Sequence, residues 1–139
     1  MLPFGLPSPF APSRGHMREE NAVPYMLLII EPRGQRQERT DAEGRAVYDR
    51  MLQYSAALKE RGVLRASQSL RNDSEGVRVR VRGGKSTLLD GPFSESKEMV
   101  GGYFLVDCAN RDEAVAIASR IPAAEWATVE VREFGPCFM

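Results

Sequence analysis

Hydrophobic residues along this chain follow two patterns, continuous runs and strict alternation, and each predicts a different kind of strand. The runs at 25–30 and 103–106 are apolar throughout, which is typical of strands buried on both faces. The segments 77–82 and 128–132 alternate apolar with polar residues, which predicts strands with only one face toward the protein. In 77–82 valine alternates with arginine, so we expect the valines to face inward and the arginines outward. A further strand is predicted over 63–70.

Two segments carry apolar residues at helical spacing. The first is predicted to run from 41 to 61, because Thr40 and Glu43 form a capping box and Gly62 provides a terminating glycine. The second follows Asn110 and ends before Pro122.

The order of these elements predicts the fold class. Gly83-Gly84 is a turn signal that joins two strands into a hairpin over about 77–89. Without this inserted hairpin the order is β-α-β-β-α-β, the ferredoxin-like α+β motif. In that motif the first and third strands are central, and these are the two runs that are apolar throughout.

The same pattern predicts an assembly. Two helices cover one face of such a sheet, yet the central strands are apolar on both faces. The sequence predicts no third helix to cover the second face. We therefore expect a homodimer in which the sheets of two copies face each other around a two-fold axis.

Composition narrows the function classes. The chain has 139 residues, enough for one domain, and 19 basic residues balance 19 acidic ones. This balance disfavours nucleic acid and anionic membranes as partners. Cys108 and Cys137 are too few for a disulfide scaffold, which favours a reduced, cytoplasmic protein. The single histidine, His16, argues against a histidine-based triad and a multi-histidine metal site, and no cofactor is expected.

The ends of the chain differ from its centre. Residues 1–24 contain five of the nine prolines and no periodicity, which predicts a disordered leader without a signal peptide or membrane span. Gly15-His16-Met17 resembles a cloning junction, although translation starting at Met1 or Met17 is an alternative. Residues 134–139 are expected to form a C-terminal tail.

The strongest candidate site is the segment 90–98. Gly91 and Pro92 would hold the Asp90 carboxylate rigidly, as a general base or a ligand-binding group requires. The alternative is an Asx-turn in which Asp90 only caps nearby N–H groups. Lys97 and Glu98 are candidate ligand-binding residues of the same pocket, or alternatively part of a solvated half-turn.

Three other features of the sequence each have a structural and a functional explanation. Ser94 and Lys97 match S-x-x-K by spacing, but Ser94 is better explained as a helix N-cap. Gly101-Gly102 permits close approach by a ligand or, more commonly, by a neighbouring strand. The arginines of 77–82 could meet an acidic ligand, but a solvated strand face is the commoner explanation.

Four segments, at 25–29, 90–98, 101–103 and 129–132, resemble the YCII-related proteins of the DGPF type. The resemblance covers about 24–133, and it departs from the usual motif in having Ser94 and Ser96 where alanine and threonine are common. It implies a dimeric α/β barrel of ferredoxin-like domains in small bacterial proteins. No reaction is securely established for this type. Some relatives are encoded beside, or fused to, extracytoplasmic-function sigma factors.

Together these observations predict a small-molecule-binding protein whose pocket lies near the Asp90 loop at the dimer edge, with Asp90 as the candidate acid–base catalyst. The alternative is a non-enzymatic interaction or regulatory module connected with a sigma factor. Whether the protein is an enzyme is left open by the sequence.

Overall fold

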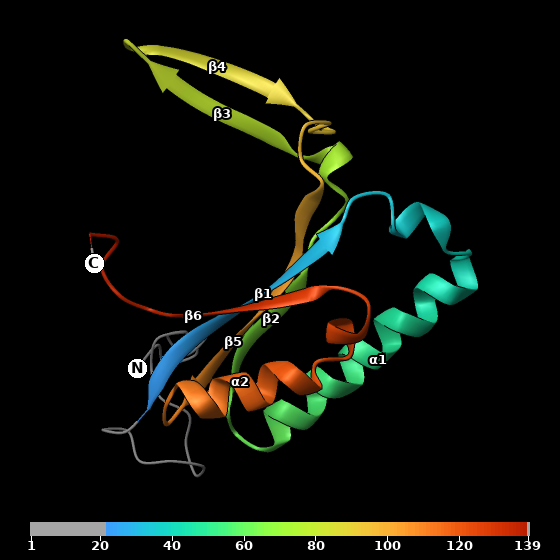
Figure 1. The fold of residues 1–139 in the computed structure, drawn as a ribbon, viewed down its shortest axis with the longest axis vertical. Coiled ribbons are helices and arrows are strands. Elements are labelled where there is room, and N and C mark those ends of the chain that lie inside the picture. The colour runs from blue at the N-terminus through green and yellow to red at the C-terminus, as the bar shows by residue number, and fades with distance from the viewer. Residues whose placement is uncertain (1–21, 139) are drawn as a thin grey trace, which may run out of the picture.

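The computed structural model describes residues 22–138 (Figure 1). The first twenty-one residues of the predicted leader lie outside this range, and Val23 and Pro24 already belong to the first strand. The strands and helices are β1 (Val23–Pro32), α1 (Asp41–Glu60), β2 (Leu64–Ser69), β3 (Val77–Arg82), β4 (Lys85–Asp90), β5 (Glu98–Cys108), α2 (Arg111–Arg120) and β6 (Thr128–Glu133). Three short 3-10 helices join them: η2 (Arg36–Glu38), η3 (Asp73–Glu75) and η4 (Pro122–Glu125).

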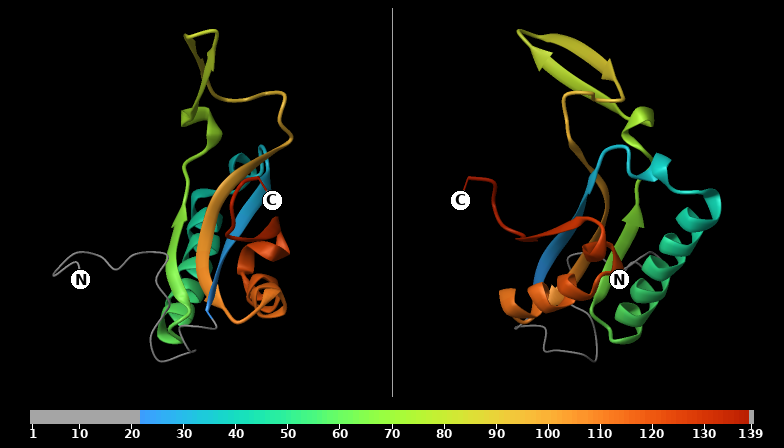
Figure 2. Two further views of the ribbon diagram at one scale, coloured as in Figure 1. Left: turned by 90° about the vertical axis from the view of Figure 1, so that its left-hand side faces the viewer. Right: turned by 45° about the vertical axis from the view of Figure 1, so that its right-hand side comes forward.

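Four of the strands form one antiparallel sheet in the order β2-β5-β1-β6. When the β3–β4 hairpin is set aside, this is the strand order of the ferredoxin-like motif, so the predicted α+β class is confirmed. The two apolar runs form β1 and β5 and occupy the centre of the sheet, as predicted. Both helices lie on one face of it (Figures 1 and 2).

The core lies between the helices and this face. Along β1 the helix-facing residues Tyr25, Leu27 and Ile29 are buried, whereas the residues between them are only half-buried. Leu27 pairs with Phe104 and packs in one cluster with residues of both helices. The second face of the sheet, which carries Met26, Leu28 and Ile30, therefore remains partly accessible in the single chain.

Both predicted helix starts are confirmed. The Thr40 side chain accepts a bond from the Glu43 backbone N–H, and the Glu43 side chain accepts one from the Thr40 backbone N–H. At α2 the Asn110 side chain accepts a bond from the Glu113 N–H, while the Glu113 carboxylate accepts one from the Ala109 N–H. Neither helix is long and apolar enough to cross a membrane, within residues 22–138.

The apolar face of α1 is only partly buried. Its apolar residues stand at helical spacing, as the sequence shows, but Leu58 near the C-terminal end is the one buried residue of this helix. Farther toward the N-terminal end, Tyr48 and Leu52 are each 49% exposed. The apolar stripe of α1 therefore faces a hollow rather than a filled core.

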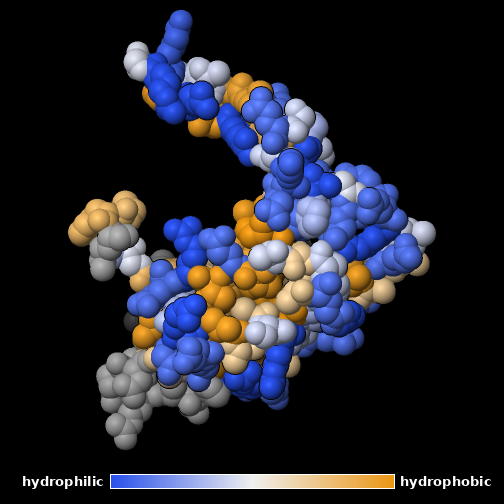
Figure 3. Space-filling view, in the orientation of Figure 1, coloured by the Kyte–Doolittle hydropathy of each residue, from blue (hydrophilic) through white to orange (hydrophobic). Residues whose placement is uncertain are grey.

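The prediction that the valines of β3 face the protein interior is wrong. β3 and β4 form a separate two-stranded sheet, and all twelve of its residues are exposed. The turn at Gly83-Gly84 is as expected, with positive φ at both glycines. The hairpin, which we call the arm (residues 77–90), projects from the end of the main sheet, and no other helix or strand within residues 22–138 covers its valines (Figures 1 and 3).

Candidate functional site

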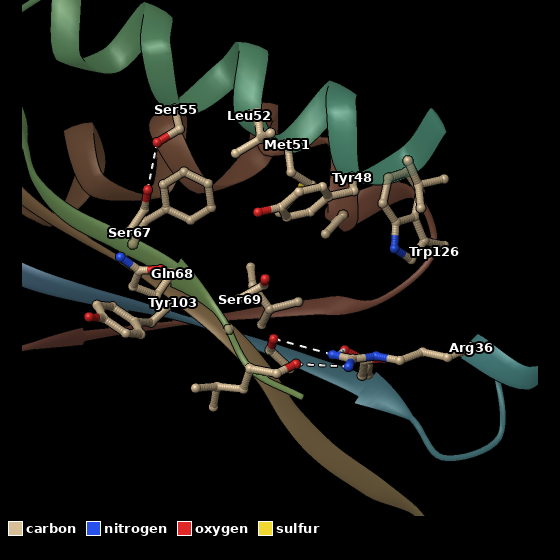
Figure 4. A pocket seen from close by; sticks show the side chains of 18 of the residues that line it. Arg36, Tyr48, Met51, Leu52, Ser55, Ser67, Gln68, Ser69, Tyr103 and Trp126 are labelled. Carbon is tan, nitrogen blue, oxygen red and sulfur yellow. Dashed lines mark hydrogen bonds and ion pairs between the residues drawn. The ribbon is translucent and has the colours of Figure 1, made fainter. Parts of the chain in front are cut away.

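A pocket of about 330 Å³ lies between α1 and the helix-facing side of the sheet (Figure 4). Its floor is formed by β1, β2 and β5, and its walls by α1 and the segment after η4. The volume falls in the range of sites that hold small organic molecules. This is the hollow that the apolar stripe of α1 faces.

One wall of the pocket is apolar. Tyr48, Met51 and Leu52 reach into it from α1, and Trp126 closes it beside η4 (Figure 4). Arg39 and Arg50 each lie 5.5 Å from the Trp126 ring centroid, and the Gln35 amide donates to the Trp126 carbonyl at 2.8 Å. Trp126 is thus held in place from three sides, which gives the wall a fixed shape.

Polar groups from the sheet and helix converge on the opposite end. The Ser55 hydroxyl of α1 and the Ser67 hydroxyl of β2 are 2.5 Å apart and share a hydrogen bond. Ser69 lies two residues farther along β2 and therefore on the same face of the sheet. The Tyr48 hydroxyl points into the cavity between these groups and the wall (Figure 4). Hydroxyls of this kind fix the orientation of a ligand rather than provide most of its affinity.

A carboxylate and a guanidinium form the floor beside β1. Arg36 donates from Nε to Glu31 Oε2 at 2.9 Å and from Nη2 to Glu31 Oε1 at 2.7 Å, which is a bidentate pair. Arg36 also donates to the Leu70 carbonyl at 2.8 Å and to the Gly101 carbonyl at 3.3 Å. Glu31 is only 7% exposed, so this pair is the charged centre of the pocket.

The strand pattern explains why Glu31 points inward. The helix-facing residues of β1 are every second one, and Glu31 continues that series after Ile29. A register shift lies at this point, between Ile29 and Ile30. A Cβ at Gly101 would lie 1.6 Å from Glu31 Oε1, and one at Gly102 would lie 2.7 Å from the Gln68 carbonyl oxygen. Of the two explanations for this glycine pair, close packing is therefore the one the geometry supports.

The predicted site residues lie elsewhere. Asp90 is the exposed last residue of β4, and Glu98 is the exposed first residue of β5, opposite Pro32. Lys97 is exposed, and its backbone carbonyl accepts a bond from the Arg33 N–H at 2.9 Å. None of the three lines the pocket between α1 and the sheet. Their roles in binding or catalysis stay predictions.

The residues after Asp90 fasten the arm to the body. The Gly91 N–H donates to the Gly76 carbonyl at 2.8 Å, and a Cβ at Gly91 would lie 1.9 Å from the Asp73 carbonyl oxygen. The Arg78 guanidinium lies over the Phe93 ring, 3.9 Å from the ring centroid. The glycine and phenylalanine of the D-G-P-F segment therefore hold the base of the arm.

The prediction that Ser94 caps a helix is wrong. Residues 94 and 95 lie in a turn, closed by the Ser96 N–H donating to the Phe93 carbonyl at 2.9 Å, and β5 begins directly afterwards at Glu98. Because no helix follows, there are no free N–H groups of a first helical turn for Ser94 to cap.

The structure offers neither an activated cysteine thiol at Cys108 nor, within residues 22–138, a cluster of metal ligands. Cys108 is buried, and desolvation raises the pKa of its thiol to about 12. A thiol with so high a pKa is almost entirely protonated at neutral pH and therefore a poor nucleophile. Residues 22–138 contain no group of three His, Cys, Asp or Glu side chains that could hold a metal ion.

Sequence reasoning missed Glu31 and Arg36. The signal was available for Glu31, because it continues the alternation of buried residues in β1 with a carboxylate at an inward position. Arg36 gave no such signal, since it lies in a short 3-10 helix after a turn and reaches Glu31 only through the path of the backbone.

We expect Gly101→Ala to lower the free energy of unfolding by about 2 kcal/mol, because the new methyl group would displace Glu31 from Arg36 and weaken hydrogen bonds between charged groups. Urea denaturation measures this change. Gly44→Ala is the matched control: it lies in α1 with no atom within 4 Å of a new Cβ, so it should raise stability by up to about 1 kcal/mol. Equal effects of the two substitutions would contradict the packing explanation.

We expect a thiol reagent at pH 8 to modify one cysteine per folded chain. Cys137 is exposed, whereas burial protects Cys108 and its raised pKa keeps it protonated. In denaturant both thiols should react, and Cys137→Ser should leave none reactive in the folded state. Rapid modification of Cys108 without unfolding would contradict its burial.

The family model of the YCII-related domain matches residues 23–136 of this chain. Uncharacterized protein R00369 of Rhizobium meliloti (strain 1021) is 40% identical over 50 residues, a stretch that covers 36% of this chain and 40% of that protein. The chain thus spans less than half the length of that relative. Because the domain match extends from β1 past β6, the chain belongs to the family of YCII-related domains.

Proposed function

We propose that the protein binds a small organic molecule in the pocket between α1 and the sheet. The observation that carries this proposal is the combination of an apolar wall with a few convergent polar groups in a space of about 330 Å³. Tyr48 and Leu52 also remain half-exposed beside this space. Removing such large apolar side chains from water is favourable. A ligand would cover them.

The charges of the pocket favour a neutral ligand. Glu31 and Arg36 neutralise each other, and four hydrogen bonds of the Arg36 guanidinium already go to protein oxygens. A guanidinium has five N–H groups, so little remains for an anionic ligand. The Glu31 carboxylate retains lone pairs beyond those that Arg36 uses. A ligand with an apolar body and one hydroxyl or N–H group fits these partners.

The Asp90 hypothesis concerns a different place, the base of the arm. Its support is the rigid backbone around Gly91 and the exposure of the carboxylate. Acid–base catalysis there, the DGPF subtype and a link to sigma factors rest on the resemblance of the segment 90–98. The cytoplasmic location rests on the cysteine content alone. The pocket at Glu31 has the stronger support for binding, because its polar groups converge on one concave, partly open space.

The ligand can be sought through Trp126, the single tryptophan of the chain, which lines the pocket. We expect compounds of the neutral class to change its fluorescence and to raise the melting temperature. Tyr48→Ala and Glu31→Gln should each weaken binding about tenfold or more, since each removes one wall contact or one charged acceptor. Glu31→Gln should also lower stability by about 2 kcal/mol, because Arg36 loses its charged partner.

Two variants are controls for this experiment. Gln53→Ala changes an exposed residue of the same helix outside the pocket and should leave affinity unchanged. Asp90→Asn tests the other site: a loss of binding in this variant, with unchanged binding in Tyr48→Ala, would transfer the function to the Asp90 loop. Binding that survives both Tyr48→Ala and Glu31→Gln would overturn the proposal.

The second proposal concerns assembly, a homodimer in which two sheets face each other and together complete an α/β barrel. Its support is the second face of the sheet, where Met26, Leu28 and Ile30 are half-buried and Val100 is 43% exposed. These side chains are neighbours across β1 and β5 and form one apolar surface. Contiguous apolar surface of this kind marks interaction sites.

Light scattering at micromolar concentration should give about twice the chain mass of 15.5 kDa. Leu28→Glu should shift the protein toward the monomer, because a carboxylate would be buried without a partner at the centre of the contact. Val115→Glu, on the exposed side of α2, is the control. A wild-type protein that stays monomeric would exclude the facing-sheet dimer.

A further inference from the structure

The arm carries more exposed apolar surface than any other part of residues 22–138. Val79 is 63% exposed and Leu88 is 67% exposed, and the three other large apolar side chains of the arm are each more than half exposed. Elsewhere in the described chain such residues are isolated or border the pocket or the second face. A surface this apolar needs an explanation other than the folding of the single chain.

Strand register divides the arm into two faces. Residues that pair directly across an antiparallel ladder lie on the same face. Val79 pairs with Leu88, so the apolar face comprises Val77, Val79, Val81 and Leu88, with Ser86 and Asp90 at its two ends. Arg80 pairs with Thr87, so the other face carries Arg78, Arg80, Arg82 and Lys85, together with Leu89 opposite Arg78. The arm is thus a ribbon with one mostly apolar face and one mostly cationic face.

The base of the arm is held in a fixed geometry. Arg33 of the body forms an ion pair with Asp73 at 2.9 Å, and both side chains are mostly buried. The Gly91 and Phe93 contacts described above hold the returning strand. An isolated two-stranded hairpin is marginally stable in water, so contacts at its base alone do not explain an ordered apolar face. The face is presented in a set position, as a docking surface would be.

We infer that the arm of each copy packs against the other copy in the homodimer, with the face of Val77, Val79, Val81 and Leu88 buried in the contact. This inference rests on the proposed dimer and adds a second contact region to it. A two-fold axis makes the contact reciprocal, so both arms are covered at once. No further partner is then needed for either apolar face.

Position favours a second copy as the occupant. The arm leans out over the side of the body on which the second face of the sheet lies (Figures 1 and 2). Hydrophobic side chains also gather at the inner angle between the arm and the body (Figure 3). A copy seated on the second face would therefore stand beside the arm, and one partner would cover two apolar surfaces that are otherwise separate.

The charges of the second face do not oppose this occupant. Glu130 pairs with Leu28 and Arg132 with Met26, so both lie on this face, where they form an ion pair at 3.8 Å. The cationic residues of a partner's arm would point away from the contact. Nucleic acid is the main competing partner for those cations, but it would leave the apolar face of the arm uncovered, and the whole chain has no net positive charge.

The test compares a variant of each face of the arm. Val79→Thr with Leu88→Thr removes one apolar cross-strand pair, and Arg80→Thr changes the adjacent position on the opposite face. We expect the dimer dissociation constant, measured by sedimentation over a dilution series, to rise at least about a hundredfold for the first variant, because two large apolar side chains lose their burial. For Arg80→Thr we expect a change of less than about threefold.

The outcomes separate this inference from the dimer itself. Wild-type affinity in Val79→Thr/Leu88→Thr, together with monomers in Leu28→Glu, would keep the facing-sheet dimer and overturn the role of the arm. A monomeric wild type would overturn both. A gel shift with an oligonucleotide that Arg80→Thr abolishes, without dimer weakening in the Thr/Thr variant, would assign the arm to nucleic acid. Circular dichroism of both variants should be unchanged, since these side chains are exposed in the single chain.

Discussion

The architecture follows from one constraint: a four-stranded sheet has two faces, and the described part of the chain supplies helices for only one of them. The helix-facing residues of β1 and β5 form the core with Leu58 and the apolar side of α2. The remaining apolar residues must be covered by a ligand or a partner, or stay partly exposed to solvent. Both proposed contact regions and the pocket are places where apolar side chains are left over after the core is filled.

The fold could be predicted because its signals are local. The capping box at Thr40, the apolar runs of β1 and β5 and the turn at Gly83-Gly84 each depend on neighbouring residues, and each appears as predicted. The direction of the β3 valines could not be predicted in this way. The alternation shows that the valines and the arginines lie on opposite faces of the hairpin. Which face packs against the rest of the protein depends on the direction in which the hairpin leaves the sheet.

The candidate site also depends on contacts that the sequence does not reveal. The segment 90–98 is the candidate that the sequence favours, and in the structure its Gly91 and Phe93 hold the base of the arm. Glu31, in contrast, is an ordinary residue at the end of a strand. It becomes the charged centre of a pocket only because Arg36 returns to it and because Gly101 leaves room for its carboxylate. Such a site arises from tertiary contacts that no single stretch of sequence contains.

The attachment of α1 has a mechanical consequence. Its buried anchor, Leu58, lies at the C-terminal end, whereas the pocket lies along the rest of the helix. Midway along, Tyr54 ties α1 to the core, because its hydroxyl donates to the Ile117 carbonyl at 2.8 Å and its ring contacts Phe104 edge-on. One turn earlier, Arg50 pairs with Glu125 of η4, but this ion pair is exposed to solvent and contributes little to stability. The first turns of α1 are therefore the least firmly attached part of the helix, and a small shift there changes the width of the pocket without opening the core.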